Sequence, residues 1–300
     1  MNMYMNEFIR FYCGESANTA RSYGDTVQDY CEFCGKTFGW SMEEVINNSN
    51  KRSVLLYIAM LSDKQLSPYT INQRISALST FFKYTIEFEH RTKENPLMGV
   101  KKMNVQGIEQ KSEYLTEEEY MALIAVTQIK VGRTKKFAFT SARDKFLYTL
   151  NLTVGLRVSE SLNLKVSQFN EDIIAIVGKG GKLRKFRVTD EVRRAFNEYM
   201  NVRYMAYEDT DTVDEGYVFV TINGNQLQTK DVNKNLKKHM ERAGIDKDIA
   251  SHSLRRSCAT HYLSEGVPVA QVSKLLGHTN VQTTMRYYKE DGSDFDFLGL

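Results

Sequence analysis

Hydrophobic residues recur at helical spacing through most of the first hundred positions. In the clearest case they follow Ser67-Pro68 at intervals of three or four, as Ile71, Ile75, Leu78, Phe82 and Ile86. Such spacing places apolar side chains on one side of an α-helix, and serine followed by proline is a typical helix start. The pattern predicts four helices, at about 19–35, from 41, at 51–61 and from 68 towards Asn95-Pro96. We therefore expect a helical N-terminal domain over residues 1–100.

The periodicity is lost between residues 98 and 113, where the chain is polar and carries lysines and glycines. We expect residues 101–113 to form a linker between two domains. Beyond it, Thr116-Glu117-Glu118-Glu119 has the spacing of a helix capping box. Further helices are expected at 141–152, 190–207 and 229–243, and a basic loop at 130–136. An alternating segment at 173–177, a glycine-rich turn and Phe186-Arg187-Val188 predict a β-hairpin, with a third strand at 217–221.

These patterns predict a mainly α fold. The second domain, residues 114–289, is expected to be α+β with a small antiparallel sheet. Its last patterned stretch, residues 251–288, predicts two helices separated by a turn, because one apolar stripe ends at a glycine and a proline begins the next.

Four polar residues in this last stretch stand outside the apolar stripes: His252, Arg255, His278 and Tyr287. The first two are three positions apart and share a helical face. The second histidine follows a helix-ending glycine, and the tyrosine comes nine residues later. Together they would form a polar site that needs no metal ion. Each residue alone is also compatible with a solvated helix face or a core tyrosine.

A second candidate group lies upstream. Gly155 ends one helix, and Arg157 stands at the start of the next. A guanidinium beside the backbone N–H groups of a helix start is well placed to hold a phosphate. The hairpin turn at 178–182 carries Lys179 among its glycines. Taken alone, this lysine is also compatible with a solubilised hairpin tip.

In this order the motifs resemble those of the tyrosine recombinase, or phage integrase, family. The family pattern is an arginine in a G-L-R-x-S-E box, a lysine in a β-hairpin, H-x-L-R, L-G-H, and a tyrosine nine residues on. It is matched here by residues 155–160, Lys179, residues 252–255, residues 276–278 and Tyr287. Five motifs in the same order are hard to obtain by chance.

The N-terminal pattern resembles the family's helical core-binding (SAM-like) domain, which clamps one face of the duplex while the catalytic domain clamps the other. The run at 70–78 is typical of the DNA-facing helix of that domain. The resemblance implies Gln73, Arg74 and Lys83 as DNA contacts, with a merely solvated face as the alternative. Because helical patterning begins almost at once, we expect the two-domain, Xer-like or Cre-like type.

The resemblance implies a site-specific DNA recombinase that works through a 3′-phosphotyrosyl intermediate. Arg157 and Arg255 would neutralise the phosphate through paired N–H donors. Tyr287 would attack after His252 takes its proton, since a phenol with a pKa of about 10 is mostly neutral at pH 7. Lys179 would protonate the departing 5′ oxygen. Neither ATP, a divalent metal nor another cofactor is expected, because the bond energy is kept in the covalent link.

Two further residues beside these motifs have expected roles. His278 is expected to hydrogen-bond the scissile phosphate, and Glu160 to brace the nearby arginine or the fold rather than do chemistry. Tyr288 adjoins Tyr287, but the nine-residue spacing from His278 favours Tyr287 as the nucleophile.

The partners implied are double-stranded DNA with paired recombination half-sites and a homotetramer on synapsed DNA, with an accessory protein or a second recombinase as a further option. Residues 290–300 form an acidic tail with four apolar residues. In the family, C-terminal segments pack into the neighbouring protomer, and we expect the same here. A frayed terminus is the alternative.

Composition narrows the picture only modestly. Lys and Arg number 40 against 37 Asp and Glu, a net charge of +3, so a DNA-facing charge must be local. There is no long apolar run and no signal peptide, which favours the cytoplasm and the nucleoid. Cys31 and Cys34 have zinc-like spacing, with Cys13 and His90 as conceivable further ligands. Their helical stripe favours core cysteines, so no metal site is expected.

Two other classes of function remain open at this point. A type IB topoisomerase uses a similar pocket but relaxes DNA without exchanging partners, and the L-G-H-to-tyrosine spacing argues against it. A catalytically inactive DNA-binding protein would be expected to lack one of the catalytic residues, and none is missing.

Overall fold

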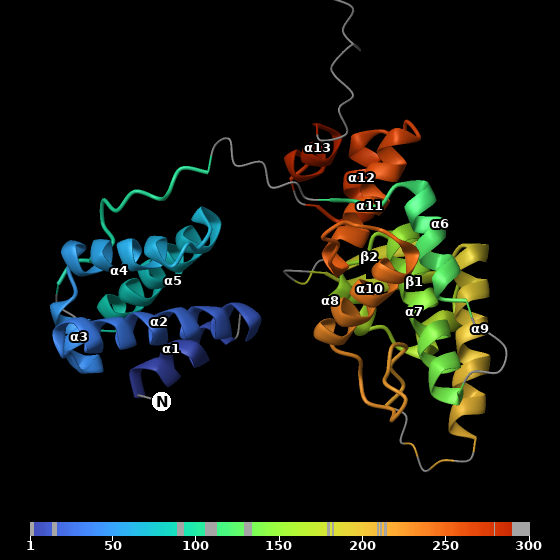
Figure 1. Ribbon diagram of the computed structural model, residues 1–300, viewed down its shortest axis with the longest axis horizontal. Coiled ribbons are helices and arrows are strands. Elements are labelled where there is room, and N and C mark those ends of the chain that lie inside the picture. The colour runs from blue at the N-terminus through green and yellow to red at the C-terminus, as the bar shows by residue number, and fades with distance from the viewer. Residues whose placement is uncertain are drawn as a thin grey trace, which may run out of the picture. The chain divides into compact units, whose positions relative to one another are not determined.

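The computed structural model describes residues 3–13, 17–88, 93–105, 113–128, 134–178, 181, 183–208, 210, 212, 215–278 and 280–289. It divides into two compact units, Met1–Gln110 and Lys111–Leu300 (Figure 1). Each unit has its own hydrophobic core.

All regular secondary structure in the described part of the first unit is helical. Its helices are α1 (Met3–Cys13), α2 (Ala17–Phe38), α3 (Met42–Asn48), α4 (Lys51–Asp63) and α5 (Pro68–Glu87). The sequence pattern predicts the last four and misses α1. The signal for α1 was present, because Met5, Phe8 and Ile9 stand at helical spacing and pack into the core of this unit. Serine caps start α3 and α5, as the pattern expects, and Asn50, for which no cap was predicted, caps α4.

Residues 101–105, expected in the linker, are attached to the first unit. Asn72 on α5 donates to the carbonyl of Met103 (3.0 Å) and accepts from its N–H (2.7 Å). On the far side, the N–H of Leu115 already donates to Ser257 Oγ (2.9 Å) in the second unit. The segment that joins the units therefore begins later than the polarity of the sequence suggests.

The second unit is mainly helical as well. Its helices are α6 (Glu117–Val126), α7 (Lys135–Val154), α8 (Val158–Leu162), the 3-10 helix η1 (Val166–Asn170), α9 (Asp190–Tyr207), α10 (Thr229–Ala243), α11 (Ser251–Ser264), α12 (Val269–Leu276) and α13 (Gln282–Lys289). The bounds of α9 and α10 are those predicted. Helix α7 begins earlier than expected, capped by Thr134, so Lys135 and Lys136 belong to its first turn rather than to a basic loop.

The sheet has two strands, β1 (Ile173–Val177) and β2 (Leu183–Arg187), paired antiparallel. Ile174 and Phe186 face each other in register and are buried. The expectation of a mainly α fold with a small antiparallel sheet is confirmed. The prediction of a third strand at 217–221 was wrong. Its residues form single bridges, Tyr217 with Lys165 and Val220 with Gln226, while the apolar side chains between them fill the core.

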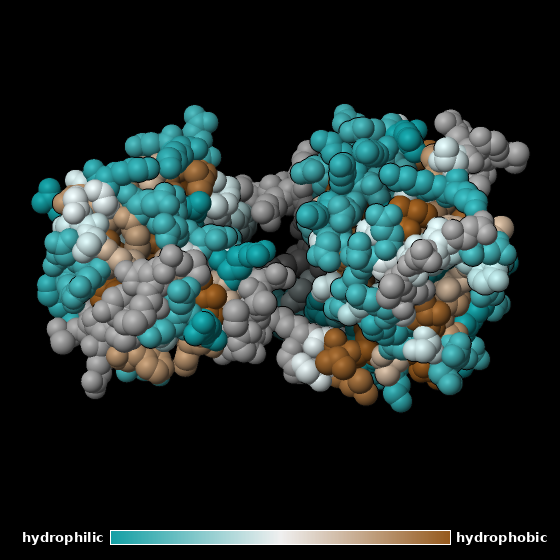
Figure 2. All heavy atoms as spheres, turned by 90° about the horizontal axis from the view of Figure 1, so that it is seen from below, coloured by the Kyte–Doolittle hydropathy of each residue, from teal (hydrophilic) through white to brown (hydrophobic). Residues whose placement is uncertain are grey.

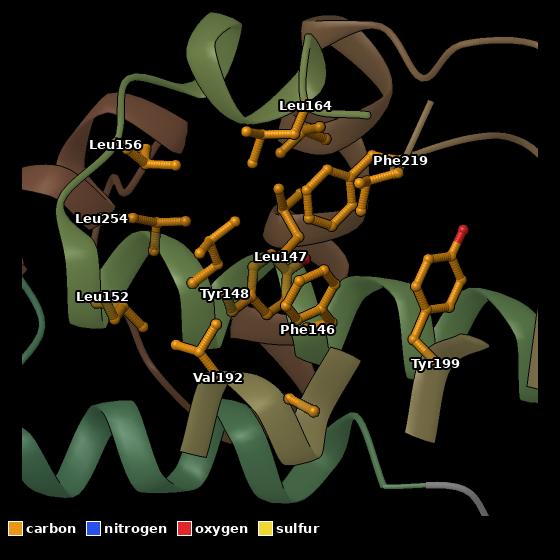
Figure 3. Close-up of a cluster of buried hydrophobic side chains, with 14 of the residues drawn as sticks. Phe146, Leu147, Tyr148, Leu152, Leu156, Leu164, Val192, Tyr199, Phe219 and Leu254 are labelled. Atoms are coloured by element: carbon orange, nitrogen blue, oxygen red, sulfur yellow. The ribbon is translucent and has the colours of Figure 1, made fainter. Parts of the chain in front are cut away.

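Helix α7 is the centre of the second unit. Buried residues lie on all its sides, which is typical of a helix enclosed by others. Figure 3 shows Phe146, Leu147 and Tyr148 of this helix among side chains from α9 (Val192) and α11 (Leu254). Because α7 leads directly into the turn before Arg157, the core fixes the position of that turn.

The surface of both units is mostly polar on the face shown in Figure 2, where hydrophobic residues emerge only in small patches. Among the described residues, no helix combines the length and the apolar character needed to cross a bilayer.

The close packing at the end of α7 gives a first prediction. Gly155 has φ +65°, and a Cβ there would lie 2.5 Å from Leu276 Cδ2 and 3.1 Å from Cys258 Sγ. Gly155→Ala should lower the free energy of unfolding by about 2–4 kcal/mol, from left-handed backbone strain plus overpacking. Gly244→Ala is the matched control, because Gly244 has φ +70° but nothing within 4 Å of the added Cβ. Urea unfolding of both variants measures the difference, and equal losses would show that the contact with α12 is not tight.

Candidate active site

The turn between α7 and α8 presents the first arginine. Gly155 caps α7 in the left-handed conformation and donates to the carbonyl of Asn151 (3.0 Å). Leu156 is fully buried and anchors the turn. Arg157 then occupies the N-cap position of α8, with its side chain about one-third exposed (35%). The predicted placement of this arginine at a helix start is confirmed.

Glu160 on α8 connects three arginines. Its carboxylate accepts from the backbone N–H (2.9 Å) and the guanidinium (2.7 Å) of Arg157, and from Arg184 Nη2 (2.6 Å). Arg255 Nη1 lies 4.0 Å from the same carboxylate. Burial acts to raise the pKa of Glu160, but the hydrogen bonds and charges of the two nearest arginines outweigh it and lower that pKa. The expectation that Glu160 braces Arg157 is confirmed.

Arg255 ties two helix ends together. From α11 it donates to the carbonyl of Gly155 (2.9 Å), just past α7, and to the carbonyl of Leu276 (2.5 Å), at the end of α12. The same helix is held to α7 by Tyr262, whose hydroxyl donates to the carbonyl of Thr153 (2.9 Å). The guanidinium is buried, and these two hydrogen bonds fix its orientation.

Arg184 was missed by the sequence reasoning. It lies on β2, reaches Glu160 and also donates to the carbonyl of Leu275 on α12. A Cβ at Gly277 would lie 3.0 Å from its Cδ, so this glycine lets the guanidinium pass. A signal was present in the alternation of β2, because Arg184 shares the inward face with the buried Phe186.

His278 follows α12 and lies close to this cluster. Its backbone N–H donates to the carbonyl of Ser273 (3.0 Å), and its ring nitrogen Nδ1 lies 2.8 Å from Thr284 Oγ1 on α13. Burial, followed by the positive charges of Arg255, Arg157 and Arg184, lowers the pKa of His278 to about 4. The imidazole is therefore neutral at pH 7.

The remaining candidate residues are His252, Tyr287 and Lys179. His252 lies exposed in the first turn of α11, whose start is fixed by Asn233 Oδ1 accepting from the N–H of Ser251 (2.9 Å). No hydrogen bond joins His252 to another residue that the structure describes. Tyr287 belongs to α13, which packs against α11 and α12 (Figure 1), but its side chain lies outside the described residues, as does Lys179 altogether.

The three residues expected to contact DNA lie on α5. Gln73 and Lys83 are exposed. Arg74 is partly buried, pairs with Asp29 and donates to the hydroxyl of Tyr57 (2.9 Å), so its guanidinium already bonds within the first unit. A role of these residues in DNA binding stays a prediction.

The cysteine pair on α2 is part of the first core. Cys34 is buried, and Cys31 lies 3.1 Å from the sulfur of Met42. Burial raises the pKa of Cys31 to about 12 and that of Cys34 to about 11, which disfavours the thiolate that a metal would bind. The side chain of Cys13 and all of His90 lie outside the described residues.

Comparison with known families decides the class. Residues 113–293 match the phage integrase family, and residues 6–88 match the phage integrase N-terminal SAM-like domain. The chain belongs to the phage integrase family of tyrosine recombinases. The family matches cover both units, which confirms the class expected from the motifs and favours a recombinase over a topoisomerase.

Individual relatives agree with this assignment of the recombinase. It is 30% identical to a tyrosine recombinase of Thermosipho africanus, over 97% of this chain and 95% of that protein. It is 31% identical to tyrosine recombinase XerA of Thermococcus onnurineus, over 92% and 86% of the two chains.

Solved structures show the same fold. The lambda integrase(75-356) dimer bound to a COC′ core site aligns with a TM-score of 0.68 at 14% identity, covering 99% of this chain and 98% of that one. The XerH site-specific recombinase in its pre-cleavage complex with difH substrate aligns with a TM-score of 0.66 at 18% identity, covering 95% and 92%.

The environment of His278 gives a second prediction, on pH. An unfolded histidine binds a proton near pH 6.5, but the folded one does so only near pH 4. The unfolded state thus takes up the proton first, so acid lowers the free energy of unfolding as pH falls from about 6.5 to about 4.

Urea unfolding at pH 7 and pH 5 measures this loss, and the loss should be smaller in His278→Gln. His239, whose pKa burial also lowers, contributes to both proteins equally, so the difference isolates His278. Identical pH dependence in the two proteins would contradict the lowered pKa of His278.

Proposed function

We propose that this recombinase cuts and rejoins DNA strands at specific sites through a 3′-phosphotyrosyl link to Tyr287. The observation that carries the proposal is the arginine cluster on Glu160, with a neutral imidazole beside it and the tyrosine-bearing helix α13 packed against α11 and α12.

The charge of the cluster suits a phosphodiester. Three guanidiniums and one carboxylate leave a formal charge of +2, while His278 stays neutral. A phosphodiester carries one negative charge, and more gathers on its non-bridging oxygens in the transition state. Fixed donors that match the charge at that stage lower the barrier more than they favour substrate binding. We assign this task to Arg157 and Arg255, with His278 donating one further hydrogen bond.

The proton transfers use the remaining candidates. The Tyr287 oxygen attacks phosphorus, His252 takes the phenolic proton, and the bond to the 5′ oxygen breaks as Lys179 gives that oxygen a proton. His252 is exposed, so a ligand that approaches the start of α11 can reach it. Attack by the 5′-hydroxyl of a partner strand reverses each step and rejoins the DNA.

We propose double-stranded DNA with paired half-sites as the partner. The lambda integrase and XerH structures are DNA complexes, and both align over more than nine-tenths of this chain. In the first unit Gln73, Arg74 and Lys83 would contact the duplex, so affinity should fall steeply with salt. Because the substrate is cellular DNA, we expect the protein in the cytoplasm at the nucleoid.

A suicide substrate tests the chemistry. DNA nicked beside a candidate crossover site is incubated in EDTA with wild type, Tyr287→Phe and Tyr288→Phe. We expect a covalent adduct with wild type and with Tyr288→Phe, and none with Tyr287→Phe, because only one phenol is the nucleophile. Denaturing electrophoresis detects the adduct.

Two outcomes would change the conclusion. No adduct on a site that the protein demonstrably binds would favour a DNA-binding protein, or an enzyme that needs a second protein. An adduct with relaxation of supercoiled DNA, but no recombinant product from two sites, would favour a topoisomerase.

Assembly gives a further prediction. We propose that four protomers act on two synapsed sites and that residues 290–300, which lie outside the described residues, pack into the neighbouring protomer. Deleting residues 294–300 should weaken tetramer assembly on DNA more than binding to one half-site. Native gels with single and paired half-sites separate the two effects, and an equal loss of both would argue for a frayed terminus.

A further inference from the structure

Thr284 is a buried hydroxyl residue with no part in the mechanism above. It lies in α13, three positions before Tyr287, and its side chain is 0% exposed. Its Oγ1 lies 2.8 Å from Nδ1 of His278. This hydrogen bond therefore joins the imidazole beside the arginine cluster to the helix that carries the proposed nucleophile.

The hydrogen bond between the hydroxyl and the imidazole can run in either direction. Either Thr284 donates to an unprotonated Nδ1, or a protonated Nδ1 donates to Thr284. The two arrangements place the single proton of a neutral imidazole on different nitrogens. In the first it lies on Nε2, and in the second on Nδ1.

The surroundings of the hydroxyl favour the first arrangement. Other helical threonines, such as Thr140, donate to a carbonyl one turn back in their own helix. Among the described residues, Thr284 makes no such bond, and Nδ1 of His278 is the acceptor that its hydroxyl has. If Nδ1 carried the proton, a buried hydroxyl hydrogen would be left without that acceptor, which costs free energy.

The proposed chemistry needs the same arrangement. Phosphate oxygens only accept hydrogen bonds, so His278 has to present an N–H to them. Burial and three arginines keep the ring neutral, so it has one N–H to present. With Nδ1 bonded to Thr284, that N–H has to be on Nε2.

We propose that Thr284 is a positioning residue that holds His278 in the Nε2–H tautomer and so supplies the hydrogen-bond donor for the scissile phosphate. This inference rests on the proposed function, in which His278 contacts that phosphate. The inference also couples the imidazole of His278 to helix α13. The backbone N–H of His278 donates to the carbonyl of Ser273, and the backbone N–H of Thr284 donates to the carbonyl of Val281 (2.8 Å). Both ends of the Thr284–His278 bond are therefore fixed, so the orientation of the imidazole and the position of α13 depend on one another.

The tautomer is measured directly by 15N NMR of the full-length protein near pH 7, where the shifts of the two ring nitrogens distinguish N–H from unprotonated nitrogen. The chain has five histidines, so His278→Gln identifies the signals of His278 by their loss. We expect the Nε2–H tautomer in wild type and in Thr284→Ser, which keeps the hydroxyl. Thr284→Val has nearly the same shape but no hydroxyl, and should lose this preference.

Cleavage of the suicide substrate is measured on the same proteins. Thr284→Val should form the covalent adduct about tenfold more slowly or worse, since a misdirected donor no longer stabilises the transition state. Thr284→Ser should retain most of the rate. Thr283→Val is the matched control, because the neighbouring Thr283 is exposed and its hydroxyl is not bonded to His278.

Three results would overturn the inference: an Nδ1–H tautomer in wild type, a Thr284→Val protein that cleaves like Thr283→Val, or slow cleavage by Thr284→Val with the wild-type tautomer, which would make Thr284 merely structural. If Thr284→Val does not fold, Thr284→Ala replaces it. Failure of wild type to form any adduct would instead count against the proposed function, since the tautomer is read without DNA.

Discussion

The buried carboxylate of Glu160 is the contact on which the candidate site depends. Three guanidiniums from α8, β2 and α11 gather within 4.0 Å of it. Like charges brought so close would repel, and buried charges are unfavourable unless they are paired. One carboxylate, only 5% exposed, makes the cluster possible without neutralising it. The positive charge that remains is then available to an anionic ligand.

The same region depends on backbone groups at helix ends. Arg255 binds carbonyls at the ends of α7 and α12, and Arg184 binds another at α12. These carbonyls lie at the negative ends of helix dipoles, where cations are stabilised. Both helices end in left-handed glycines, Gly155 and Gly277, each with a neighbouring side chain in the space that a Cβ would take. The glycines therefore serve close approach as well as helix termination, and this accounts for their place in the two motifs.

Much of the fold, and the position of Arg157, could be predicted from the sequence. Helix α10 has a polar exterior, an apolar stripe and a terminal glycine, so its bounds followed from local signals alone. The position of Arg157 followed in the same way from a glycine and a helix start. These features are encoded within a few residues of where they act.

Features that depend on distant segments were harder to predict. The alternation of β2 turns Arg184 inward, but only the packing of β2 beside α8 and α12 shows which groups the guanidinium meets. Residues 217–221 have the composition of a strand, but they fill the core instead of extending the sheet. The polar residues at 101–105 suggest a linker, yet the side-chain amide of Asn72 pairs with both backbone groups of Met103. In each case a tertiary contact outweighed the local pattern.

The arrangement of the site separates two tasks. The groups proposed to meet the phosphate charge are held in place by buried contacts, Arg255 by two carbonyls and His278 by Thr284 and Ser273. Donors fixed in this way need little reorganisation when charge develops, which is the condition under which electrostatic stabilisation is strongest. His252, expected to accept a proton, is instead exposed at the start of α11. In the proposed mechanism Tyr287 acts from α13 at a site whose charge is already in place, and the bond from Thr284 to His278 links the position of that helix to the site.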